Sequence, residues 1–112
     1  MSTSRVVTAL ASAARTVTGT IDLGAIPGDY QELTVYIDVT AVGGTPSMTS
    51  TYQSSPDGVT FYDQTAGAAL TAVSRQAIRV AANAGVFGRV AYTISGAAAS
   101  LTFTVVVEYK RP

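Results

Sequence analysis

Hydrophobic and polar residues alternate along much of the chain. In the segment 33–40 (LTVYIDVT) every second residue is Leu, Val or Ile, and the residues between them are Thr, Tyr and Asp. The segments 90–94 (VAYTI) and 101–110 (LTFTVVVEYK) alternate in the same way. A period of two is typical of a strand that buries one face. These segments are therefore predicted to be strands, and the Ser95-Gly96 pair is predicted to turn the last two into a C-terminal hairpin.

Weaker strand patterns lie at 15–23, 47–53, 58–63, 70–73 and 77–80, each bounded by Gly, Pro, Asp or Ser. The Ala-rich segments 11–15 and 81–85 are too short for an independent helix and are expected to form one helical turn at most. Turn residues recur about every 8–12 positions, which is typical of β-sandwiches and small barrels. The predicted fold class is all-β: a single antiparallel β-sandwich of jelly-roll or Ig-like type, or a small β-barrel, with about 7–9 short strands.

The stretch SSPDGVTFYD (54–63) raises the question of an acidic site, because it carries two carboxylates. Pro56, Asp57 and Gly58 suit successive positions of a turn, and both flanks are strand-like, which predicts a hairpin tip. A calcium site formed by Asp57 and Asp63 is the alternative. That site would need several more oxygen ligands, and the spacing of a calcium-binding loop is missing.

The length of 112 residues, of which 47% are hydrophobic, is sufficient for one domain with one core. We expect residues 15–112 to form a single sandwich domain. Residues 1–14 are expected to be either an N-terminal arm or the first strand of the sandwich.

Charged residues make up only 12% of the chain, against roughly 25% in an ordinary soluble domain, and the net charge is zero. Such a surface protects a free monomer poorly from association, so we expect partners to cover part of it. The scattered basic residues argue against nucleic-acid binding. The uncharged stretch 90–107 is long enough for a membrane helix, but its period of two predicts strands, so no membrane contact is expected.

The chain contains neither Cys nor His, so thiolate nucleophiles, the commonest metal ligand and the most versatile acid–base residue are all missing. A nucleophilic serine would lack a base, since Lys110 is the only amine side chain. Asp29 with Glu32, or Asp57 with Asp63, could form a glycosidase pair, although seven acids will always offer some such pair. We expect no enzyme activity, no catalytic residue, no metal and no cofactor; a small hydrolase with an Asp pair is the weakest hypothesis.

Most aromatic residues fall on the apolar phase of a predicted strand and are expected in the core. Tyr30 and Tyr36 lie on polar phases or at strand starts, and they are candidate contact residues. Arg79 and Arg89 are candidate anchors for a partner or a neighbouring subunit, because arginine is enriched at interfaces. The alternative for both arginines is surface solubility and ion pairs with Asp or Glu.

Four segments in this order resemble small β-sandwich structural proteins of tailed bacteriophages: ALASAART (9–16), LTVYIDVTAVGGTP (33–46), SSPDGVTFYD (54–63) and GRVAYTISGAAASLTFTVVVE (88–108). The resemblance implies a virion component made in the host cytoplasm, foremost a capsid decoration or cement protein. Such proteins bind the major capsid protein on the capsid exterior, often as trimers, and reinforce the shell. The resemblance implies no catalytic residues.

Two further hypotheses follow from this resemblance. The protein could instead be a tail or fibre module that contacts carbohydrate or protein on the host surface. In either role, the N-terminal segment with Arg5, Val6 and Val7 could add a strand to the edge of a neighbouring sheet, which makes these residues candidate contacts.

Overall fold

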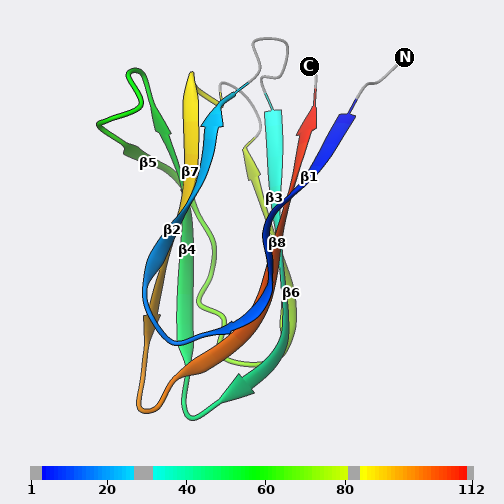
Figure 1. The fold of residues 1–112 in the computed structure, drawn as a ribbon, viewed down its shortest axis with the longest axis vertical. Helices are drawn as coiled ribbons and strands as arrows, with labels where there is room; N and C mark the ends of the chain where they lie inside the picture. The colour runs from blue at the N-terminus through cyan, green and yellow to red at the C-terminus, as the bar shows by residue number, and fades with distance from the viewer. Residues whose placement is uncertain (1–3, 27–31, 81–83, 111–112) are drawn as a thin grey trace.

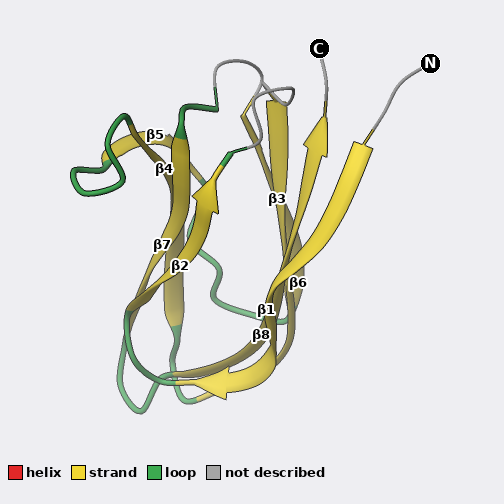
Figure 2. Ribbon diagram, turned by 45° about the horizontal axis from the view of Figure 1, so that its top comes forward, coloured by secondary structure: helices red, strands yellow, loops and turns green. Residues whose placement is uncertain are grey.

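The computed structural model describes residues 4–26, 32–80 and 84–110, and these residues form eight strands and no helix (Figures 1 and 2). The predicted all-β sandwich is therefore confirmed. No helix among these residues is long and apolar enough to cross a membrane. In chain order the strands are β1 (Ser4–Arg15), β2 (Gly19–Ala25), β3 (Glu32–Gly43), β4 (Ser47–Ser55), β5 (Tyr62–Ala66), β6 (Ser74–Val80), β7 (Phe87–Ser95) and β8 (Ser100–Lys110).

The strands form two antiparallel sheets of four strands each. Sheet A has the order β1-β8-β3-β6, and sheet B has the order β2-β7-β4-β5. The pairs are nested: the first strand pairs with the last, β2 with β7, β3 with β6 and β4 with β5. This nesting is the topology of a jelly roll, in which a long hairpin is rolled into two sheets. Among the predicted alternatives, the strand order therefore matches the jelly roll. Residues 4–15 form a strand of its sheet A.

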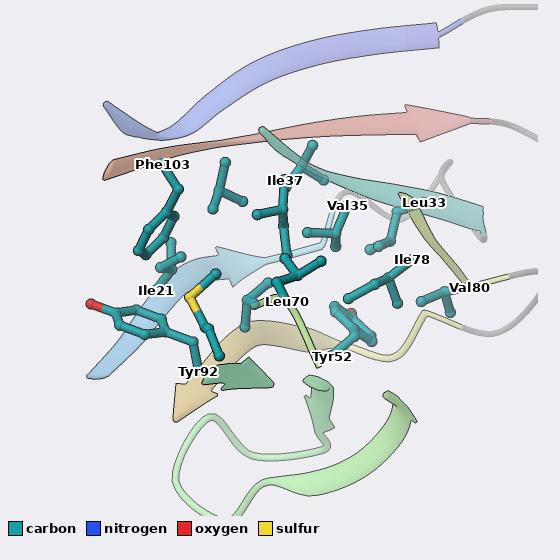
Figure 3. Packing of buried hydrophobic residues seen from close by; sticks show 14 of the residues in the cluster. Ile21, Leu33, Val35, Ile37, Tyr52, Leu70, Ile78, Val80, Tyr92 and Phe103 are labelled. Carbon is teal, nitrogen blue, oxygen red and sulfur yellow. The ribbon is translucent and has the colours of Figure 1, made fainter. Parts of the chain in front are cut away.

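The core lies between the inner faces of the two sheets (Figure 3). The apolar phase of β3, which ends in Val39, is buried, and so is the apolar phase of β8, as the alternation predicted. Near one end, the rings of Tyr92 and Phe103 meet edge to face, with centroids 5.4 Å apart and an interplanar angle of 78°. Tyr52 is fully buried and donates its hydroxyl hydrogen to the carbonyl oxygen of Ala84; burial raises the pKa of its phenol.

Three sequence-based expectations about strands are wrong. β7 and β8 do not form a hairpin, because the chain passes from sheet B to sheet A between them. The segment 70–73 is not a strand: it pairs only through the bridge between Leu70 and Met48, since the chain here also crosses between the sheets. The Ala-rich segment 11–15 is part of β1 and not a helical turn. The other Ala-rich segment, 81–85, lies partly outside the described residues.

The connections β3–β4 and β7–β8 lie together at the lower end of the molecule in Figure 1. The Thr45 amide donates to the carbonyl oxygen of Ala97, 3.1 Å away. Gly96 has a φ of 111° and approaches the Thr45 carbonyl so closely that a Cβ atom would collide with it. Gly44, with a φ of 66°, approaches the Ala98 carbonyl in the same way. The two loops therefore pack closely against each other, and they hold the two sheets together at this end.

The stretch 54–63 connects β4 to β5 as a hairpin tip, as predicted, although the second strand begins only at Tyr62. The Asp57 carboxylate accepts hydrogen bonds from the amides of Val59 and Thr60 at 2.9 and 3.0 Å and from the Ser55 hydroxyl at 2.9 Å. These bonds lower the pKa of Asp57, the Thr60 and Val59 amides being the main causes. Asp57 thus stabilises the turn through its carboxylate.

Candidate interaction surfaces

The residues predicted as contacts lie in three places. Val6, Tyr36 and Arg79 lie on the outer face of sheet A, from three different strands. Arg5 and Val7 point to the other side of β1, toward β2, because they pair with the buried positions Tyr109 and Val107. Arg89 lies on the outer face of sheet B, and Tyr30 lies outside the described residues.

The first surface is a crevice between β1 and β2, which are the edge strands of opposite sheets. It contains two hollows of about 230 and 150 Å³, and Val7, Leu23 and Tyr109 line both. Arg5 lines one hollow and Asp22 the other, so the apolar floor has charged residues at either end. We call this surface the edge crevice.

A β-bulge in β2 places Leu23 in the edge crevice. The pairing with β7 shifts between Asp22 and Gly24, so Leu23 has no partner opposite it. The Asp22 carboxylate accepts a hydrogen bond of 2.8 Å from the Gly24 amide, and Gly24 has a φ of 69°. Bulges of this kind redirect a side chain at a sheet edge. The short motif Asp22-Leu23-Gly24 therefore aims an apolar side chain at β1.

The two halves of β1 differ in how open their edge is. Residues 4–8 pair with β8 without a register shift, whereas shifts follow at Leu10 and Ala13. In the second half, the Arg15 guanidinium donates to the carbonyl oxygens of Ala11, Ala13 and Phe103 at 3.0, 2.9 and 3.2 Å. It also lies 5.0 Å from the centroid of the Phe103 ring. Only the first half of β1 is thus a regular edge to which another strand could be added.

The second surface is the outer face of sheet A, where the strand register arranges side chains in rows across the strands. One row, Ser4-Lys110-Glu32, lies at one end, and three further rows follow it. The central row is largely uncharged and contains Tyr36, which is 43% exposed. The rows beside it carry charges of both signs. A hollow of about 520 Å³ lies over the central row and the row of Asp38. From β1 to β6, the rows are Val6-Glu108-Thr34-Arg79, Thr8-Val106-Tyr36-Ala77 and Thr104-Asp38-Arg75.

The charges on this face are paired loosely and near water. Arg75 lies 3.5 Å from Asp38, and Arg79 lies 3.6 Å from Glu32, with the arginine side chains 87% and 72% exposed. The ion pair of Arg79 matches the alternative considered from the sequence. The Tyr36 hydroxyl donates to the Glu108 carboxylate at 3.0 Å, and this bond raises the pKa of Tyr36. Exposed pairs of this kind stabilise a fold little, so they are available to a partner.

The third place, around Arg89, is occupied by contacts within the molecule. The Arg89 guanidinium lies 4.1 Å from the centroid of the Phe61 ring, and its Nε donates to Gln53 Oε1 at 2.6 Å. Gln53 in turn donates to the Asp63 carboxylate at 2.7 Å. Arg89 therefore holds the β4–β5 hairpin against sheet B. Among the described residues, no group of three or more acids is placed to hold a metal ion.

Sequence reasoning missed several residues of both surfaces. The strand phase that places Tyr36 on the outer face also places Asp38 there, and the equivalent phase of β8 does the same for Val106 and Glu108. The alternation that singled out Tyr36 could therefore have included all three. Arg75 could have been found through the same phase on β6. Leu23 shares the apolar phase of the buried Ile21, so alternation on β2 could have indicated its side as well.

Comparison with known proteins supports the fold. No protein-family model matches the chain, and no curated protein matches its sequence. Among solved structures, a chain in the structure of the infectious bursal disease virus Gx strain is similar, with a TM-score of 0.52 and 12% sequence identity. The alignment covers 99% of this protein, which spans 33% of that chain. At this identity the likeness establishes the fold alone, and the tailed-bacteriophage family stays a prediction.

Proposed function

We propose that the protein is a non-enzymatic structural component of a virion, and that it decorates the capsid by binding the major capsid protein on the outer shell. Three observations support this role together. The ordered segments resemble structural proteins of tailed bacteriophages, the strand order is a jelly roll, and a chain in a virus structure has a similar fold. Jelly rolls are common among viral capsid and lectin domains.

The edge crevice carries the proposal, because it offers both main-chain and side-chain contacts to an extended segment of the shell protein. Among the described strands, the regular half of β1 has a partner on one side only, so its other side presents main-chain donors and acceptors. Beside it, Val7 and Leu23 can receive an apolar side chain of that segment. Many copies on a symmetric shell would make even modest contacts effective.

The acids of the protein favour a non-enzymatic role. Glu32 and Glu108 line one hollow of about 270 Å³, but Glu32 pairs with Arg79 and Glu108 accepts the Tyr36 hydroxyl. Lys110 lines the same hollow. Both carboxylates are therefore engaged by side chains beside them, whereas the two carboxyl groups of a glycosidase must flank its substrate.

The test is co-sedimentation of the purified protein with mature empty capsids. We expect binding that saturates at a fixed ratio to the shell protein, and at least about tenfold weaker binding for the double variant Val7→Ser/Leu23→Ser, which makes the crevice polar. The matched control is Thr49→Ser/Thr93→Ser, two exposed positions on the outer face of sheet B. Unchanged binding by the crevice variant, with its fold verified by thermal unfolding, would contradict the proposed docking. No binding by the wild-type protein would contradict capsid decoration.

A second candidate function is a tail or fibre module that binds host carbohydrate. The exposed ring of Tyr36, beside a hollow that Asp38, Arg75 and Thr104 also line, favours it, because sugar sites combine an aromatic face with polar groups. A glycan array with wild-type protein and the variant Tyr36→Ala tests this candidate. Glycan binding that the variant loses, together with no affinity for capsids, would replace the decoration proposal.

A further inference from the structure

The charges on the outer face of sheet A match when the face is turned over onto a second copy. Arg79 on β6 and Glu108 on β8 both pair with Thr34, so they lie in one row on opposite sides of β3. A two-fold axis that runs along β3 exchanges these two sides. Each Arg79 then lies opposite Glu108 of the second copy, and this contact occurs twice.

We propose that this face binds the same face of a second copy, related by that two-fold axis. The central row fits the arrangement. Tyr36 lies on the axis and meets Tyr36 of the second copy, while Val106 meets Ala77. The hollow of about 520 Å³ beside Tyr36 gives the incoming ring space. The contact thus brings apolar groups to the centre and opposite charges around them, as in known interfaces.

The third row decides between two possible axes. An axis along β3 places Asp38 opposite Asp38 and Glu32 opposite Glu32 of the second copy. Asp38 has its own Arg75 at 3.5 Å and Glu32 its own Arg79 at 3.6 Å, which offset the like charges. An axis across the strands through Tyr36 would exchange the outer rows and place Arg79 opposite Arg75. Those two arginine side chains extend into water, and they would repel each other. The charge pattern therefore selects the axis along β3.

This contact leaves the edge crevice free. With the axis along β3, only β8, β3 and β6 overlap in the two copies, because β1 lies two strands from β3 on the side of β8. With only three strands of each copy in contact, we expect a small interface and a weak dimer. The inference does not depend on capsid binding, and a dimer formed this way presents two edge crevices.

Sedimentation equilibrium of the free protein from about 1 to 500 µM tests the inference. We expect a monomer–dimer equilibrium, weakened at least about tenfold by Arg79→Glu alone or Glu108→Arg alone, and restored to within about threefold in the double variant Arg79→Glu/Glu108→Arg. Restoration requires that the two residues meet, so it separates a contact from a general loss of stability. The control Thr93→Glu, on the outer face of sheet B, should dimerise like the wild type.

Three outcomes would overturn the two-fold contact: a wild-type monomer throughout this range, a trimer, or a dimer that the charge reversals leave unchanged. Failure of the double variant to recover would overturn it as well. The crevice variant Val7→Ser/Leu23→Ser should still dimerise, so loss of capsid binding and loss of the dimer are separate results.

Discussion

The outer faces of the two sheets carry the same kinds of residue and use them differently. Each sheet has four strands, and each outer face contains arginine, acids and an aromatic ring. On sheet A, Arg75 and Arg79 extend into water and make long ion pairs. On sheet B, Arg89 lies against Phe61 and hydrogen-bonds to Gln53. The difference comes from the β4–β5 hairpin, whose tip supplies Phe61 to sheet B, so Arg89 contributes to the fold whereas the arginines of sheet A remain exposed.

The difference between the two faces depends on the two sheets keeping their relative positions. The variant Gly96→Ala should disturb these positions and have the largest effect on stability. An Ala here would adopt a φ of 111° and place its Cβ against the Thr45 carbonyl. We expect a loss of at least about 2 kcal/mol in the free energy of unfolding and a melting temperature lower by about 10 °C. Thermal unfolding followed by circular dichroism measures both.

Gly24→Ala is the matched control for that variant. Gly24 also has a positive φ, of 69°, but no atom lies within 4 Å of an added Cβ. The cost should therefore be the backbone term alone, about 1 kcal/mol. Equal losses for the two variants would show that the close packing of the two loops contributes nothing to stability beyond the backbone conformation.

The next largest effect should separate the two faces directly. Removing the Arg89 side chain by Arg89→Ala takes away a cation–π contact and a hydrogen bond, so we expect about 1–2 kcal/mol of destabilisation. Arg75→Ala, on sheet A, removes only an exposed ion pair and should change stability by less than about 0.5 kcal/mol. Urea unfolding of both variants measures the difference. If Arg75→Ala costs as much as Arg89→Ala, the exposed charges of sheet A are part of the fold after all.

Much of the fold could be predicted from local pattern, but the partners of the strands could not. The alternation in β3 and β8 identified both strands and their buried phase, because a period of two records which side faces the core. The predicted hairpin of β7 and β8 was wrong for a physical reason. A Ser-Gly turn allows the chain to reverse, yet it does not determine whether the next strand stays in the same sheet or crosses to the other.

The candidate surfaces were predictable to a lesser extent. Tyr36 was found through its strand phase and Arg79 because arginine is enriched at interfaces. Only the register of β3 with β6 and β8 shows that Arg79 and Glu108 lie in one row, on either side of Thr34. Arg89 has the same phase signal and a different role, because the residue that covers it, Phe61, comes from a loop 28 positions earlier in the sequence. Strand phase predicts the side of a sheet; it does not predict what else lies on that side.

Acid should loosen the tip of the β4–β5 hairpin, and this is the smallest of the expected effects. The pKa of Asp57 is lowered in the folded protein, so its contribution to stability is present above the unfolded value of about 4 and is lost as the pH falls through the folded value. Protonation weakens the acceptor for the Val59 and Thr60 amides. As the pH falls through the folded value, we expect the protection factors of these two amides, measured by hydrogen exchange in NMR spectra, to decrease.

The variant Asp57→Asn tests whether the acid response comes from Asp57, and the response of Tyr36 gives the matching test for sheet A. An Asn keeps an acceptor oxygen but does not titrate, so the acid response at Val59 and Thr60 should disappear. On sheet A the sign is reversed: the raised pKa of Tyr36 means that its bond to Glu108 persists below about pH 10 and is lost as the pH rises through the folded value. If raising the pH through the Tyr36 transition also exposed the Val59 and Thr60 amides, the hairpin tip and the outer face of sheet A would respond as one unit, which would contradict the independence of the two faces.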